Sequence, residues 1–156
     1  MAIKITTAAQ AAALHGVKIL CYGRAGMGKT TLCATAPTPI ILSAEAGLLS
    51  LRQYDIPVIE IRTIDDLQDA YQWATESAEA APFETICLDS LSEIAEVVLT
   101  NAKRTSKDPR QAYGELIERM GVTVRAFRDL SGKHVYMSAK QESIKDETAG
   151  TTTYGP

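Results

Sequence analysis

The sequence predicts an α/β fold, with a mostly parallel central sheet, helices on both of its faces and a β-hairpin at the C-terminal end. Short apolar runs of strand length alternate with longer stretches of helical periodicity. A phosphate-loop pattern, G-x-x-x-x-G-K-T, fills residues 23–30 between the first apolar run and the first helical stretch. With 156 residues, of which 46% are hydrophobic and 22% charged, the chain is long enough to bury one core. We therefore expect a single domain over residues 1–156.

Each element follows from a local pattern. Val17 to Tyr22 is an apolar, β-branched run, as a buried parallel strand requires. The helix after the phosphate loop should end before Pro37, because proline disfavours helical backbone in the residue before it. Thr63 is a predicted N-cap, with two aspartates favourable in the first turn that follows. The expected strands are residues 17–22, 39–45, 57–62, 84–89 and 134–139, the expected helices are residues 29–36, 48–53, 64–81, 90–103 and 111–130, residues 1–16 are an N-terminal extension, and residues 140–156 hold a hairpin that turns at Ala149-Gly150.

Charge and cysteine content narrow the function classes. The net charge is −3, yet residues 55–96 carry eleven acidic residues against one basic, and residues 101–133 carry eight basic against four acidic. This asymmetry indicates a basic face opposite an acidic one, or else two solvated surfaces without a partner. Three cysteines without a C-x-x-C pair argue against a disulfide framework or a zinc site, and we expect reduced core thiols in a cytoplasmic protein. No apolar run approaches the roughly 20 residues of a membrane span, so we expect no membrane partner.

The phosphate-loop pattern predicts nucleotide binding. Its glycines let successive backbone N–H groups turn toward phosphate oxygens, which a side chain would block. Lys29 would reach the β- and γ-phosphates of ATP, and the Thr30 hydroxyl would bind Mg²⁺. The residues predicted to surround the phosphates are Gly23, Arg24, Ala25, Gly26, Met27, Gly28, Lys29, Thr30 and Thr31.

Two carboxylates follow strands on the side of the sheet where the phosphate loop lies. Asp89 ends the fourth strand and is a candidate Mg²⁺ ligand, although it could instead cap the next helix, a role that Ser90 could fill equally well. Glu45 ends the second strand and is the candidate base that activates water, with Glu93 as the alternative. The competing interpretation makes Glu45 an ordinary solvent-exposed residue.

The ordered set of these segments resembles a known family. The phosphate loop, a glutamate after the next strand (LSAEAGL) and Leu88-Asp89-Ser90 resemble the ATPase core of RecA/RadA-like recombinases. The segments VKILCYGRAGMGKTTL, TICLDSLSEI, QAYGELIERM and KHVYMSAKQE are more similar to the small phage-encoded RecA-like ATPases of the single-strand annealing (Sak-type) group.

The resemblance implies an ATP- and Mg²⁺-dependent protein that binds single-stranded DNA, promotes annealing or strand pairing and assembles into a ring or filament. A single-strand DNA-binding protein is a further implied partner, and the host bacterial cytosol is the implied location. Lys140 and Gln141 match the position of the polar residue that senses the γ-phosphate, and the catalytic residues would be Lys29 and Glu45. RecA-like cores usually continue past the position of Pro156, so we expect at most weak hydrolysis. The implied DNA-binding residues are Lys103, Arg104, Lys107, Arg110 and Lys145.

Two other functions stay open at this point. A P-loop small-molecule kinase would need a lid with several arginines, whereas Arg119, Arg125 and Arg128 lie on one predicted helix. A nucleotide switch would dock a protein partner on the acidic region 55–96 without binding DNA. Within the basic stretch Tyr113 could stack on a base, but we expect it to pack at the start of its helix instead.

Overall fold

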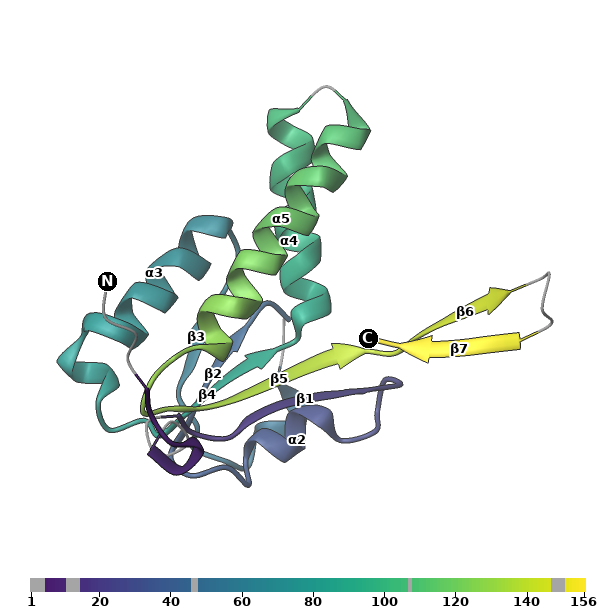
Figure 1. The fold of residues 1–156 in the computed structure, drawn as a ribbon. Coiled ribbons are helices and arrows are strands. Elements are labelled where there is room, and N and C mark those ends of the chain that lie inside the picture. The colour runs from purple at the N-terminus through teal and green to yellow at the C-terminus, as the bar shows by residue number, and fades with distance from the viewer. Residues whose placement is uncertain (1–4, 11–14, 46–47, 107, 147–150) are drawn as a thin grey trace.

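The computed structural model describes residues 5–10, 15–45, 48–106, 108–146 and 151–156. Within these ranges five parallel strands form a sheet in the order β1-β5-β4-β2-β3, and two antiparallel strands, β6 and β7, form a separate hairpin (Figure 1). The α/β prediction with a parallel sheet and a C-terminal hairpin is therefore confirmed. The strands are β1 Lys18–Gly23, β2 Pro39–Ser43, β3 Val58–Glu60, β4 Thr85–Asp89, β5 His134–Lys140, β6 Glu142–Asp146 and β7 Thr151–Gly155.

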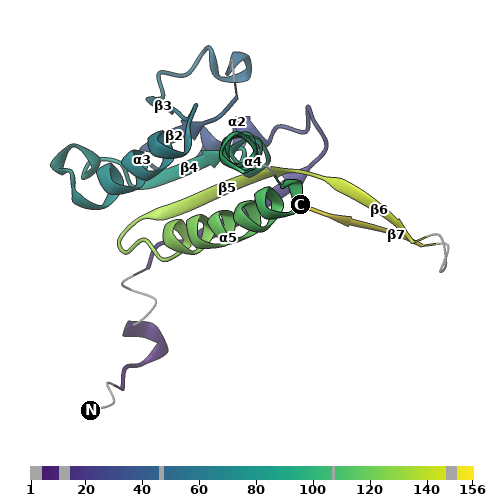
Figure 2. The same cartoon turned by 90° about the horizontal axis from the view of Figure 1, so that it is seen from above.

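Helices cover both faces of the sheet. Figure 1 shows α2 below the sheet and α3, α4 and α5 above it, and Figure 2 shows the upper three helices from above. The larger core lies under those three helices, and Phe127 of α5 packs its ring edge-on against Tyr71 of α3. The smaller core lies between the sheet and α2, where the free thiols of Cys33 and Cys87 are in contact. This contact, together with burial, raises the pKa of Cys33. The helices are α2 Lys29–Cys33, α3 Ile64–Glu76, α4 Leu91–Thr105 and α5 Pro109–Arg128, with short 3-10 turns at Leu49–Leu51 and Ala78–Ala80.

Capping side chains explain where the longer helices begin. Thr63 and Asp66 form a reciprocal capping box at the start of α3, as the sequence predicted for Thr63. Ser90 accepts a hydrogen bond from the Glu93 N–H at the start of α4. Asp108 caps α5, and Pro109 occupies the first helical position, where its missing N–H costs nothing.

The helix after the phosphate loop is shorter than predicted. It ends at Cys33 instead of Ala36. The N–H groups of Ala34, Thr35 and Ala36 donate to carbonyls three residues back instead of four. This tighter winding takes the chain out of the α-helix before Pro37, which disfavours helical backbone at Ala36.

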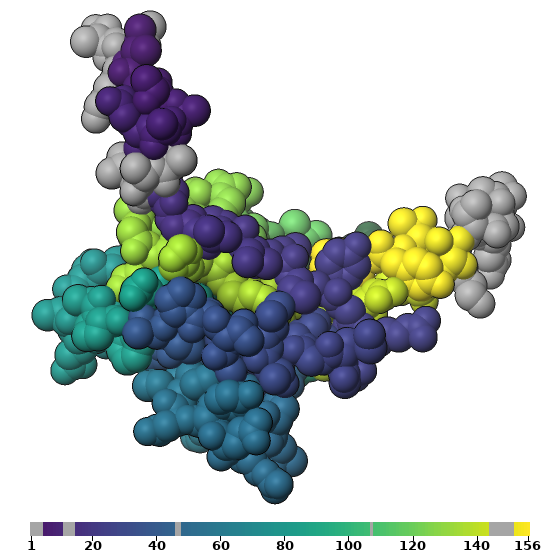
Figure 3. Space-filling model, turned by 90° about the horizontal axis from the view of Figure 1, so that it is seen from below, coloured from purple at the N-terminus to yellow at the C-terminus, as the bar shows by residue number. Residues whose placement is uncertain are grey.

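Two segments project from the body of the molecule. Helices α4 and α5 run antiparallel as an arm that rises from the sheet, held near its end by Leu99, Ala102 and Ala112 (Figure 1). The β6–β7 hairpin extends sideways from the end of β5; its expected turn at Ala149-Gly150 lies outside the described residues. Residues 5–10 stand apart from the sheet in the space-filling view (Figure 3). No helix within the described ranges is both long and apolar enough to cross a membrane.

Candidate functional site

The phosphate loop connects the carboxyl end of β1 to the first turn of α2. Gly26 and Gly28 have φ values of 78° and 84°, in the left-handed region that other residues seldom adopt, and no atom lies within 4 Å of where a Cβ would stand. Lys29 Nζ donates hydrogen bonds to the carbonyls of Gly23 and Arg24, at 2.8 and 3.0 Å. The ammonium group therefore lies inside the curve of the loop, where it is solvated by backbone oxygens.

An open pocket of about 780 Å³ lies between the phosphate loop and the carboxyl ends of β2 and β4. It brings together loop residues, both predicted carboxylates and one cation from β5. Most of the predicted nucleotide-site residues are here, whereas Gly23, Arg24, Met27 and Gln141 do not line it. Its walls are Ala25, Gly26, Gly28, Lys29, Thr30, Thr31, Ala44, Glu45, Ser50, Asp89, Ser90, Glu93 and Lys140.

Asp89 is the most buried charged group at this pocket, with 1% of its surface exposed. One carboxylate oxygen, Oδ1, accepts a hydrogen bond from Ser138 Oγ on β5. The other, Oδ2, is buried and has no hydrogen-bond partner among the residues that the structure describes. A buried carboxylate oxygen without a partner is costly, and because Asp89 lines the pocket, a cation bound there would satisfy this atom. The alternative role as helix cap is wrong, since Ser90 provides the cap of α4.

Glu45 is exposed, as the competing interpretation had it, but it lies on the pocket wall. Ser90 Oγ donates to Glu45 Oε1 at 3.2 Å, and the Glu45 N–H donates to Ser43 Oγ at 3.2 Å. Ser90 therefore holds the carboxylate beside the pocket and Ser43 holds the backbone of Glu45, and no salt bridge to this carboxylate is found among the residues that the structure describes. The geometry thus allows Glu45 to accept a proton from a water molecule in the pocket.

Lys140, the last residue of β5, forms an ion pair with Glu93 of α4. The bond to Glu93 raises the pKa of Lys140, so the amine is a cation at neutral pH. The Lys140 N–H also donates to Ser92 Oγ at 2.9 Å. Gln141 does not line the pocket, and its N–H donates to the Gly23 carbonyl at 3.1 Å, which joins the start of the hairpin to the phosphate loop.

Strand β5 carries a row of polar side chains, of which only Lys140 was predicted from the sequence to belong to the site. Tyr136, Ser138 and Lys140 alternate with apolar residues and point to the face that carries the pocket. Tyr136 Oη donates to the Lys29 carbonyl at 2.8 Å, and burial raises the pKa of this phenol. Because β5 lies between β1 and β4, these side chains contact the phosphate-loop helix, Asp89 and Glu93 in turn. The signal was present in the sequence: polar residues at every second position of an otherwise buried strand.

Three of the five predicted DNA-binding residues, Lys103, Arg104 and Arg110, lie on the α4–α5 arm, away from the pocket, whereas Lys145 belongs to β6 of the hairpin. Lys103 and Arg104 are exposed in the last turn of α4, and Arg110 is exposed in the first turn of α5. Lys103 Nζ lies 5.7 Å from the centre of the Tyr113 ring. Tyr113 is 51% exposed, so the expectation that it packs at the start of its helix is wrong. Lys107 and the side chain of Lys145 lie outside the described residues.

The parallel sheet, the loop at the end of its first strand and the carboxylates around the pocket define a P-loop ATPase domain with an α/β fold. A sequence model of an AAA domain family, AAA_24, matches residues 15–156, and the chain belongs to this family. No curated protein matches the sequence.

Among solved structures, the chain is similar to the KaiC-like protein PH0186 from the hyperthermophilic archaeon Pyrococcus horikoshii OT3. The two chains share 15% sequence identity with a TM-score of 0.49, and the similarity covers 81% of this chain and 62% of that one. The chain thus spans less than two thirds of the length of that protein.

Proposed function

We propose that this protein binds Mg²⁺–ATP in the pocket beside the phosphate loop, binds single-stranded DNA on the α4–α5 arm, and promotes annealing or strand pairing in phage recombination. One observation carries the proposal: a single helix joins the two sites. The N-cap of α4, Ser90, lines the pocket, and its last turn carries Lys103 and Arg104. The 15 residues of α4 span about 22 Å, so a shift at the pocket can move the arm as a rigid lever.

The residues around the pocket fit a magnesium–nucleotide complex. The left-handed glycines leave the loop open to phosphate, and Lys29 would exchange its two carbonyl partners for phosphate oxygens. Thr30 and the unpartnered oxygen of Asp89 would hold Mg²⁺ and its water shell, which are the hard oxygen ligands that this ion prefers. When bound, Mg²⁺ neutralises phosphate charge and so favours phosphoryl transfer. Glu45 would orient water and accept its proton, while Lys140 would contact the terminal phosphate.

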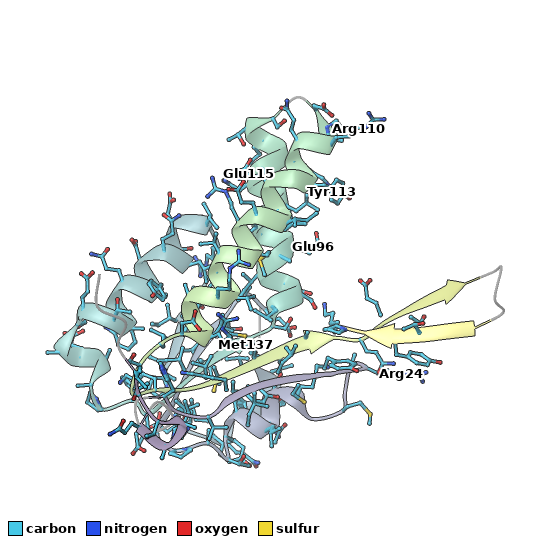
Figure 4. All side chains as sticks on the ribbon, in the orientation of Figure 1. Arg24, Glu96, Arg110, Tyr113, Glu115 and Met137 are labelled. Carbon is cyan, nitrogen blue, oxygen red and sulfur yellow. The ribbon has the colours of Figure 1, made fainter. Side chains whose placement is uncertain are left out.

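The end of the arm fits a nucleic-acid backbone. Lys103, Arg104 and Arg110 are exposed there, and the carboxylate of Asp108 is engaged as the cap of α5. Figure 4 shows Arg110 and Tyr113 projecting from the arm. Cations that neutralise phosphates gain affinity by releasing counterions, without base specificity. The exposed ring of Tyr113 would provide a stacking platform for a base. Assembly into a ring or filament would place several such arms along one strand.

The test is fluorescence anisotropy of a labelled oligo-dT strand with and without ATP–Mg²⁺ at two salt concentrations. Wild type should bind in a salt-sensitive manner, and more tightly with nucleotide. Changing Lys103, Arg104 and Arg110 to glutamine should weaken binding and reduce the salt slope by about 2, since each contact to a single strand contributes roughly 0.7.

The matched control changes three exposed arginines that lie away from the end of the arm to glutamine and removes the same charge. Its binding and salt slope should stay close to wild type. Equal loss in both triple variants would move the DNA site away from the end of the arm. No binding of wild type under any condition would leave a nucleotide switch with a protein partner. The control residues are Arg52, Arg125 and Arg128.

A further inference from the structure

We propose that Ser138 is a positioning residue for magnesium: its hydroxyl fixes the Asp89 carboxylate so that the free oxygen faces the metal. This inference rests on the magnesium–nucleotide part of the proposed function. Ser138 is fully buried in β5 and does not line the pocket. It can therefore influence the metal only through a neighbour, and its hydroxyl contacts Asp89.

The sheet places these two residues side by side. Strands β4 and β5 pair in parallel, with Leu88 opposite Met137, so Asp89 and Ser138 follow at the next position. An ionised carboxylate only accepts hydrogen bonds, so the Ser138 hydroxyl must be the donor. It satisfies Oδ1 and leaves Oδ2 as the buried, unpartnered atom.

Fixing the carboxylate matters because its own torsion is soft. The final torsion of aspartate is broad and roughly two-fold, so an unrestrained carboxylate can turn either oxygen, or its edge, toward the pocket. The bond from Ser138 selects one orientation before the metal arrives. Hydrogen bonds to metal-ligating carboxylates commonly affect metal affinity by 10- to 100-fold. Ser138 should therefore act on magnesium affinity and not on the contacts of the nucleotide itself.

The experiment measures fluorescent mant-ADP binding by purified full-length protein, once in EDTA and once across a Mg²⁺ titration. Ser138→Ala should keep the metal-free nucleotide affinity within about 2-fold of wild type. It should raise the Mg²⁺ concentration for half-maximal tightening by about 10-fold or more. Ser138→Thr keeps the hydroxyl and should restore the wild-type response. If Ser138→Ala does not stay folded, Ser138→Cys, with similar volume and a weaker donor, should give a smaller shift in the same direction.

Thr85→Val is the matched control. Thr85 is also buried on β4, and its hydroxyl donates to the Pro37 carbonyl at 2.8 Å, where it contacts no pocket residue. Thr85→Val should change neither the metal-free nucleotide affinity nor the Mg²⁺ concentration for half-maximal tightening of nucleotide binding. In a double-mutant cycle, Ser138→Ala should add no further loss to Asp89→Asn, because both changes remove the same function.

Three results would overturn the inference. An unchanged Mg²⁺ response in Ser138→Ala would show that the Asp89 carboxylate does not depend on Ser138 for its orientation. An equal loss of affinity with and without Mg²⁺ would make Ser138 a purely structural residue. If wild type binds mant-ADP identically with and without Mg²⁺, the magnesium site itself fails, and the proposed function loses that part together with this inference.

Discussion

Replacing Lys140 with methionine tests whether the cation at the end of β5 contacts the terminal phosphate of ATP. In this structure Lys140 is paired with Glu93, and both side chains line the pocket. Binding of ATP, but not of ADP, would offer Lys140 a γ-phosphate in place of the carboxylate. Methionine keeps the length and the apolar stem of the side chain while removing its charge.

The magnitude follows from two opposing terms. A hydrogen bond between charged groups is worth about 1.5–3 kcal/mol. Against this stands the loss of the Lys140–Glu93 pair, whose side chains are 52% and 30% exposed. A solvated pair of this kind is worth about 0.2–1 kcal/mol. The difference of about 1–2 kcal/mol predicts that Lys140→Met reduces the preference for ATP over ADP by about 5- to 30-fold.

The assay is competition of ADP and of a non-hydrolysable ATP analogue against mant-ADP, for wild type and both partners of the pair. Lys140→Met should weaken only the ATP analogue. Glu93→Gln should shift the preference toward ATP, by up to about 5-fold, because Lys140 no longer has to leave a carboxylate. An unchanged ratio in Lys140→Met, or the same direction of change in both variants, would refute the reasoning.

Three further predictions concern two residues of the site and the capping box of α3. Lys29→Ala should weaken ATP binding by at least about 100-fold. Its melting temperature should change little, because the hydrogen bonds that Lys29 loses are to carbonyls of a solvent-accessible loop. Wild-type affinity in a mant-ATP titration would contradict the loop assignment. Glu45→Gln should keep ATP binding but lower phosphate release by about 100-fold or more, and undiminished release would move the base to Glu93. The backbone N–H of Arg62 holds the pKa of Asp66 below its ordinary 3.8, so this stabilisation is present above that pH and is lost as the pH falls through the lowered value. The melting temperature of Asp66→Asn should therefore fall less between about pH 6 and pH 3 than that of wild type. An equal fall in both proteins would exclude this contribution.

Local patterns were sufficient to predict most of the elements. The alternation of apolar runs with periodic stretches depends on nearest neighbours, and so does the cap at Thr63, which is why both were visible in the sequence. The end of α2 was placed three residues too late, because the tightening of the last turn before Pro37 leaves no mark in the pattern. The exposure of Tyr113 was also missed, since it depends on how far the α4–α5 arm rises from the sheet.

The candidate site was predictable only in part. The phosphate loop was recognisable by its motif, and Asp89 and Glu45 by their positions at strand ends. The structure places all three around one pocket. The alternating polar residues of β5 were visible in the sequence, but their partners were not, because no local pattern shows that the fifth strand inserts between the first and the fourth. Only this order places Ser138 beside Asp89, at a sequence separation of 49 residues.

The central claim is that the pocket binds Mg²⁺–ATP and that this binding is linked to DNA on the arm. Isothermal titration calorimetry of a non-hydrolysable Mg²⁺–ATP analogue, with and without saturating oligo-dT, tests it most directly. About one nucleotide should bind per chain, and it should bind more tightly when DNA is present, because linkage between two sites is reciprocal. Nucleotide binding of equal affinity with and without DNA would contradict the linkage, and an absence of nucleotide binding in both titrations would contradict the account as a whole.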